Sequence, residues 1–161
     1  MQKDKNTPIQ EQFQTPEAVA NYMASLLPFG CKTILEPTPG LGNLVKAAKP
    51  YCKNIIAPNR FEDIEKDSRF DAVIMNPPFT PMAQGYEFLF NVMPMSDNVI
   101  ALLPWLVIIN SEKRLKAIQD FGLVSITNLP RKTFPGTRIQ CCILVLQKGY
   151  LGVTTFKSFN W

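Results

Sequence analysis

A buried strand that ends in two consecutive prolines most constrains how this 161-residue chain can fold. The stretch from Phe70 to Met75 has the length and composition of a strand inside a sheet, and Asn76-Pro77-Pro78-Phe79 follows it. Two prolines remove two backbone donors and hold the chain extended, so the strand cannot continue directly into a helix. The Asn76 amide and the Pro77 carbonyl are therefore displayed where open α/β sheets bind ligands. A rigid turn with no further role is the plain alternative.

A glycine-rich turn follows an earlier strand, expected at residues 33–35. Its sequence is Glu36-Pro37-Thr38-Pro39-Gly40-Leu41-Gly42, and a helix is expected from 43 to 49. Gly40 and Gly42 let the backbone approach a ligand without a Cβ in the way. A lone Gly-x-Gly is usually only a turn. Here an acidic residue closes the strand before it, and Asn76 follows 34 residues after Gly42.

Together the two motifs resemble those of the Rossmann-like S-adenosylmethionine-dependent methyltransferases that modify amino groups, most closely the N6-adenine DNA methyltransferases. That family has Asp/Glu-Pro-x-x-Gly-x-Gly as its first motif and Asp/Asn-Pro-Pro-aromatic as its catalytic motif, and residues 36–42 and 76–79 fit both. The resemblance covers about residues 12–149. It implies an α/β fold with a mostly parallel sheet flanked by helices, S-adenosyl-L-methionine as the cofactor, and transfer to N6 of adenine in DNA.

The resemblance also implies which residues act. Asn76 and Pro77 would supply two carbonyl acceptors to the target amine, Pro78 would complete the turn, and Phe79 would stack on the target base. The expected cofactor-binding residues are Phe13, Thr15, Glu36, Pro37, Gly40, Gly42, Asn59, Glu62, Asp63 and Asn76. Because the two loops must meet for methyl transfer, the carboxyl ends of the strands at 33–35 and 71–75 are expected to be adjacent.

The interval between the two motifs departs from the family. A βαβ unit takes about 30 residues, and the family normally fits more than one between these motifs. One helix, after a second strand expected at 54–57, is therefore predicted to be deleted or reduced to a turn. Asn59 stands where the family has an acidic residue for the ribose hydroxyls. Glu62 and Asp63 resemble a later acidic position that contacts the adenine amino group, with solvated surface acids as the alternative.

The amino-terminal part divides at Phe13. Residues 1–12 are predicted to be a disordered tail, and residues 13–161 a single catalytic domain. A helix is expected after Thr15-Pro16-Glu17, with Thr15 as its cap and Pro16 at its first position. By resemblance to the family, Phe13 and Thr15 cover the methionine end of the cofactor.

The segment between two expected strands, at 123–128 and 139–147, is the best nucleic-acid candidate. Arg131, Lys132 and Arg138 can meet phosphates, and Phe134 can stack or wedge. A solvated loop is the alternative. Because 82 residues follow Phe79 and the sheet takes up most of them, no target-recognition domain is expected. Specificity is expected from short loops, a separate specificity subunit or a homodimer, and residues 150–161 are expected to add a strand or a tail.

The composition excludes several other chemistries. The chain has no histidine, which excludes His-based triads, bases and metal sites. Its four cysteines show no Cys-x-x-Cys spacing, so no metal site is expected. The chain also has no Pro-Cys pair, which argues against a cytosine ring methyltransferase with a thiolate nucleophile. No apolar run reaches the roughly 18 residues of a membrane span, and the start is too polar for a signal peptide. A cytoplasmic protein is expected, and its net charge of +4 suits a polyanionic substrate.

Three other activities share the Asn-Pro-Pro-aromatic motif. They are methylation of RNA at guanine N2 or adenine N6, methylation of protein glutamine at N5, and cofactor binding by an inactive scaffold. The protein methyltransferases carry a separate helical substrate domain, which is not expected in this chain. Asn59 and the shortened interval favour the scaffold.

Overall fold

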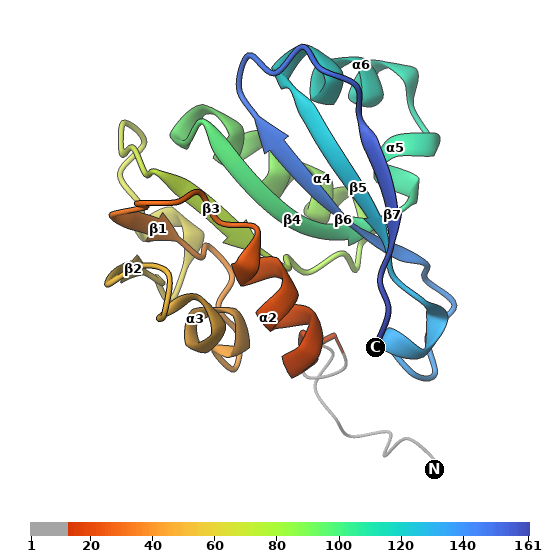
Figure 1. The fold of residues 1–161 in the computed structure, drawn as a ribbon, viewed down its shortest axis with the longest axis horizontal. Coiled ribbons are helices and arrows are strands. Elements are labelled where there is room, and N and C mark those ends of the chain that lie inside the picture. Colours follow the sequence, from red (N-terminus) through yellow and green to blue (C-terminus); the bar gives the residue numbers. More distant parts are fainter. Residues whose placement is uncertain (1–12) are drawn as a thin grey trace.

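A seven-stranded sheet with helices on both faces forms the body of the protein (Figure 1). The computed structural model describes residues 13–161, so the predicted tail of residues 1–12 lies outside the described residues. The strands are β1 (Thr33–Leu35), β2 (Asn54–Ile56), β3 (Ala72–Met75), β4 (Asn98–Pro104), β5 (Leu123–Asn128), β6 (Cys141–Gln147) and β7 (Thr155–Ser158). The helices are α2 (Glu17–Ser25), α3 (Asn43–Ala48), α4 (Met82–Val92), α5 (Leu106–Ile109) and α6 (Glu112–Phe121), with short 3₁₀ turns η1 (Phe61–Asp63), η2 (Met93–Met95) and η3 (Arg131–Thr133).

The sheet is mostly parallel, as predicted. Its strand order is β2-β1-β3-β4-β6-β5-β7, and β6 runs antiparallel to its neighbours β4 and β5. The other pairs, β1 with β2, β1 with β3, β3 with β4 and β5 with β7, are parallel. Ile34 pairs with Ala72 and Leu35 with Val73, which confirms that the strands before the two motifs are adjacent. Both motifs therefore leave the sheet at the same edge.

Each face of the sheet has its own apolar core because side chains alternate along a strand. Ile34 and Ile74 pack on the face covered by α2 and α3. Leu35 and Met75 pack on the opposite face, against α4 and α6. All four residues of β3 are buried, which fits a central strand covered on both sides. This double burial holds the end of β3, and with it the Asn-Pro-Pro turn, in a fixed place.

The interval between β2 and β3 contains a 3₁₀ turn where a helix would otherwise cross. Residues 57–71 include η1, which confirms the prediction of a helix reduced to a turn. β2 is consequently an edge strand of three residues, and it is largely exposed. Beyond β2, the edge of the molecule is therefore formed by the loop that contains η1.

The start of α2 corrects one expectation from the sequence. Pro16 precedes the first helical residue, and no side chain caps the helix. The Thr15 hydroxyl instead accepts a hydrogen bond from the Asn76 side chain. Thr15 thus connects α2 to the turn after β3, a use that local capping patterns do not reveal.

Two further findings concern the described part of the chain. Its four cysteines are free thiols, three of them buried. Among residues 13–161, no helix is long and apolar enough to cross a membrane.

Candidate active site

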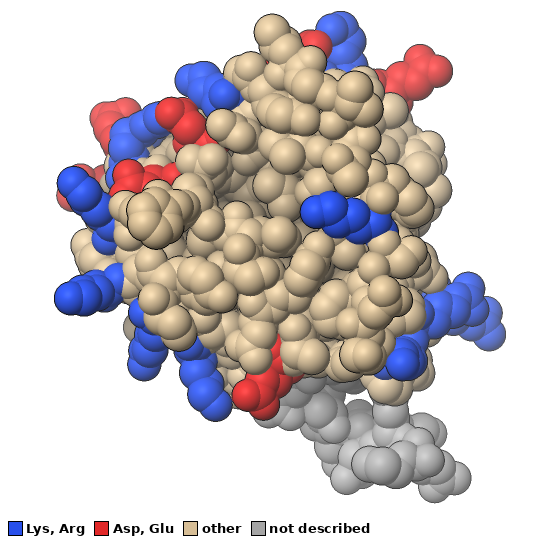
Figure 2. Space-filling model, viewed as in Figure 1, with Lys and Arg blue, Asp and Glu red and all other residues tan. Residues whose placement is uncertain are grey.

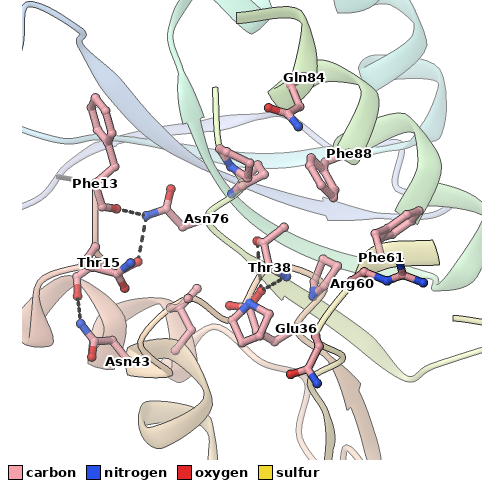
Figure 3. Close-up of a pocket in the computed structure, with 18 of the residues that line it drawn as sticks. Phe13, Thr15, Glu36, Thr38, Asn43, Arg60, Phe61, Asn76, Gln84 and Phe88 are labelled. Atoms are coloured by element: carbon pink, nitrogen blue, oxygen red, sulfur yellow. Dashed lines mark hydrogen bonds between the residues drawn. The ribbon is translucent and has the colours of Figure 1, made fainter. Parts of the chain in front are cut away.

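The Asn76 side chain is held in one orientation at the end of β3. Its Nδ2 donates to the Phe13 carbonyl at 2.7 Å and to the Thr15 Oγ1 at 3.0 Å (Figure 3). These two bonds use both N–H groups of the amide, so Oδ1 must point away from Phe13 and Thr15. Oδ1 is buried and has no hydrogen-bond partner within residues 13–161.

An unpartnered buried acceptor is uncommon in a folded protein. Leaving such a group without a bond costs roughly 1–3 kcal/mol, so each instance calls for an explanation. At Asn76 two acceptors fix the amide nitrogen, and this leaves the buried oxygen as an acceptor without a donor. The geometry is that of a preformed acceptor for an N–H group.

The glycine turn after β1 carries a buried carboxyl group at the same edge of the sheet as Asn76. The Glu36 side chain is 1% exposed and accepts bonds from the Thr38 backbone N at 2.8 Å and from its hydroxyl at 3.3 Å. Burial raises the pKa of Glu36 to about 8, although the two bonds from Thr38 oppose that rise. Near neutral pH the carboxyl group therefore holds a proton more often than an exposed glutamate does.

Glycine is required at two positions of the turn. Gly40 has φ of +52° and Gly42 has φ of +83°, in the left-handed region that residues with a Cβ rarely adopt. The Gln14 side chain lies over this turn, and its Oε1 accepts a bond from the Leu41 backbone N at 3.2 Å. A Cβ on Gly40 would stand 2.8 Å from the Gln14 Nε2. The sequence did not single out Gln14.

A cavity of about 530 Å³ lies between the residues that follow β1, β2 and β3. Its volume falls within the range of small-molecule and cofactor sites. Eight of the ten predicted cofactor residues line it: Phe13, Thr15, Glu36, Pro37, Gly40, Asn59, Glu62 and Asn76. Gly42 shapes the turn without lining the cavity. Asp63 does not line it either, and pairs with Arg60 at 3.3 Å on the surface.

Several cavity residues were not predicted from the sequence. They are Gln14, Thr38, Pro39, Asn43, Leu44, Arg60, Phe61, Gln84 and Phe88, with Pro77 and Pro78 of the catalytic motif lining the cavity as well. Asn43 follows the glycine turn directly, and its Nδ2 donates to the Thr15 carbonyl at 2.9 Å. Gln84 and Phe88 come from α4, one turn apart, so only the packing of that helix brings them to the site (Figure 3).

Three aromatic rings pack together next to Asn76. The Phe13 ring lies 4.8 Å from that of Phe79 and 5.9 Å from that of Phe134. Phe79 and Phe134 are only 3% and 4% exposed. The structure therefore corrects the expectation that Phe134 is free to stack or wedge, because its ring is buried against Phe13. The Phe79 ring is covered as well, so the expected stacking of a target base on it does not fit this arrangement.

The basic residues of the expected nucleic-acid loop are exposed. Arg131 and Lys132 lie in η3, and Arg138 precedes β6. Their loop joins the carboxyl end of β5 to β6, at the same edge of the sheet as Asn76. The structure thus brings the basic loop and the Asn-Pro-Pro turn to one edge.

Comparison with known proteins shows which solved structures share this fold. No protein-family model and no curated protein sequence matches the chain. A type I restriction-modification methyltransferase subunit from Streptococcus thermophilus aligns with a TM-score of 0.74 at 18% identity, over 91% of this chain and 47% of that one. A putative class I S-adenosylmethionine-dependent methyltransferase from Listeria monocytogenes aligns with a TM-score of 0.71 at 15% identity, over 96% and 68%. The fold is that of class I S-adenosylmethionine-dependent methyltransferases.

A third similar structure is a putative RNA methyltransferase from Pyrococcus horikoshii. It aligns with a TM-score of 0.60 at 18% identity, over 92% of both chains. By contrast, this chain spans about half the length of the type I modification subunits that it matches. At these identities the likeness establishes the fold, and function must be argued from the residues of the site.

Proposed function

We propose that this chain transfers a methyl group from S-adenosylmethionine to an exocyclic amino group, with N6 of adenine in DNA as the target. The observation that carries the proposal is the Asn76 amide, whose nitrogen is held by Phe13 and Thr15 while Oδ1 has no partner. An amine approaching the turn would meet that oxygen as a ready acceptor.

The cavity beside Asn76 suits the cofactor. The backbone of the turn at Gly40 would pass close to it, and Glu36 offers a buried polar group on the same side. Asn59 and Glu62, from the loop after β2, offer polar groups for hydroxyl and amino substituents at the far wall. When bound, the cofactor would supply an activated methyl group on a sulfonium, an excellent leaving group.

The residues of the turn would prepare the amine for attack. An amino group on an aromatic ring is a weak nucleophile because its lone pair is delocalised into the ring. Asn76 Oδ1 and the Pro77 carbonyl would accept its two hydrogens and favour a tetrahedral nitrogen. The lone pair is then free for in-line transfer, which would form the N–C bond as the C–S bond breaks with its electron pair going to sulfur, and the extra proton on nitrogen would pass to water. This is catalysis by orientation and electrostatic stabilisation, and it needs no titrating base.

The nature of the target rests on different observations. The type I modification subunits that share the fold support DNA as the substrate. The putative RNA methyltransferase, which matches over 92% of both chains, supports adenine or guanine in RNA as the second candidate. We further propose that target selection requires a separate specificity subunit or a second copy of the chain.

Transfer of a radioactive methyl group from S-adenosylmethionine tests the proposal. Purified protein is incubated with DNA, RNA and protein pools, and the modified nucleosides or residues are then identified. We expect N6-methyladenine in DNA, and far less of it with the Asn76→Ala variant. Cofactor binding without transfer to any pool would contradict the proposed activity and support the inactive scaffold.

A further inference from the structure

All of the net positive charge lies in the last quarter of the chain. Residues 121–161 contain no Asp or Glu, whereas residues 1–120 contain 12 basic and 13 acidic residues. The five cations of residues 121–161 are Arg131, Lys132, Arg138, Lys148 and Lys157. All five are exposed, and no ion pair involves them within the described residues 13–161. Such a concentration of one sign of charge attracts a polyanion.

Four of these cations lie near the edge of the sheet that carries Asn76. Three belong to the basic loop between β5 and β6, residues 129–140. Lys157, in β7, pairs with Thr127, one residue before β5 ends. β5 and β7 run in the same direction as β3, so their carboxyl ends lie at the Asn76 edge. In Figure 2, the lower right-hand part of the visible face shows basic side chains and no acidic ones.

The fifth cation lies at the opposite edge. Lys148 follows the carboxyl end of β6, where Gln147 pairs with Asn98 at the start of β4. The Lys148 backbone N donates to the Asp97 carbonyl at the same place. Lys148 therefore provides a control with equal charge and a different location.

In the segment 155–161, Lys157 and Phe159 lie on the face of the sheet that α2 covers. The Tyr22 hydroxyl, from α2, bonds to the β5 residue beside Lys157, and the Tyr22 ring lies 5.4 Å from that of Phe159. Phe159 lies 5.5 Å from Trp161, and the Lys132 ammonium lies 5.5 Å from the centre of the Trp161 ring. We call the following residues the carboxyl-terminal strip: Lys132, Lys157, Phe159 and Trp161.

The strip continues to the catalytic turn through the basic loop. Figure 1 shows the carboxyl end of the chain beside that loop. Phe134 of the loop packs on Phe13, whose carbonyl holds the Asn76 amide. Trp161 is 53% exposed, and Lys132 and Lys157 are exposed as well, so an aromatic ring and two ammonium groups are open to solvent in this part of the molecule. Cations next to exposed aromatic rings suit a strand of phosphates and unstacked bases.

We propose that the carboxyl-terminal strip binds the backbone of a nucleic-acid strand and directs it toward the Asn-Pro-Pro turn. Lys132 and Lys157 each meet a phosphate, and the exposed face of Trp161 supports a base. The inference deepens the proposed function and rests on it for the choice of nucleic acid as the polyanion. The binding itself requires no cofactor and no turnover.

Binding of a fluorescein-labelled single-stranded DNA oligonucleotide tests the strip, measured by anisotropy over a range of salt concentrations without cofactor. Lys157→Gln should weaken binding several-fold and reduce the slope of log K against log salt by about 0.7. Lys132→Gln together with Lys157→Gln should reduce the slope by about twice that amount. Lys148→Gln removes the same charge and should change neither quantity. Melting temperatures confirm that each variant is folded.

Each other outcome overturns the proposal. Equal effects of Lys157→Gln and Lys148→Gln would mean that only the overall charge matters. No binding by wild type at low salt would mean that the strip takes no nucleic acid. A changed sedimentation coefficient for Lys157→Gln, with binding intact, would make the strip an interface between copies of the chain. Methyl transfer by wild type, measured separately, shows whether the proposed function survives any of these results.

Discussion

Replacing Thr15 with Val tests how the Asn76 amide is held. Val has nearly the shape of Thr but no hydroxyl, so the change removes one of the two acceptors of Asn76 Nδ2 and leaves the other, the Phe13 carbonyl. Thr15 is only 3% exposed, so water cannot readily replace the lost acceptor. An unsatisfied buried N–H group costs roughly 1–3 kcal/mol, and the variant should lose stability by about that amount.

The same change should slow methyl transfer more than it weakens cofactor binding. With one acceptor gone, the amide loses about 1 kcal/mol of preference for the orientation that presents Oδ1. Since 1.36 kcal/mol corresponds to tenfold in rate, we expect a loss of about fivefold in the single-turnover rate per folded molecule. Thr15→Ser keeps the hydroxyl and is the matched control, with a rate close to wild type.

Two measurements check this reasoning. Single-turnover methylation at saturating cofactor gives the rate, and NMR of the Asn76 side-chain amide reports its hydrogen exchange, which should be faster in Thr15→Val. The NMR result does not depend on whether the wild type methylates any substrate. Equal amide exchange and equal transfer rates in Thr15→Val, Thr15→Ser and wild type would refute a positioning role for Thr15.

The remaining predictions concern the cofactor loop and the catalytic turn. Gly40→Val should abolish binding of S-adenosylmethionine, because a β-branched side chain would strain a turn with φ of +52° and would fill part of the cavity that Gly40 lines. Wild-type affinity in calorimetric titration would rule out this site. Burial raises the pKa of Glu36 to about 8, so the folded state binds this proton more tightly than the unfolded state. Its contribution to stability is complete below about pH 4.5 and is lost as pH rises through 8. Glu36→Gln should remove that loss, and urea unfolding curves with the same pH dependence as wild type would contradict this. Asn76→Asp should keep part of the transfer activity because it still presents an acceptor oxygen, and a rate as low as that of Asn76→Ala would show that an oxygen at this position is insufficient.

The sequence predicted the parts of the fold that local patterns determine. The apolar run before Asn76 and the acidic residue before Gly40 placed two parallel strands side by side, and the structure confirms both the pairing and the reduced helix between them. These features depend on burial and on backbone restrictions, which nearby residues reveal.

The details of the site depend on contacts between distant residues, and here the sequence was insufficient. The bond from Asn76 to Phe13 spans 63 residues, and the bond from Leu41 to Gln14 spans 27. The burial of Phe134 follows from its packing on Phe13, so a loop that looked open by composition has its aromatic residue inside. These hydrogen-bond partners and the burial of Phe134 are determined by tertiary packing, which local sequence patterns do not reveal.

Single-turnover methylation of an adenine-containing oligonucleotide by wild type and Asn76→Ala, at saturating cofactor, tests the central claim most directly. If Oδ1 accepts a hydrogen bond from the target amine, the variant should still fold and bind cofactor, with a melting temperature lowered by the loss of the bonds to Phe13 and Thr15, but it should react about 10²–10³ times more slowly per folded molecule. A variant that melts at a lower temperature yet transfers methyl groups at the wild-type rate per folded molecule would show that the turn is only structural.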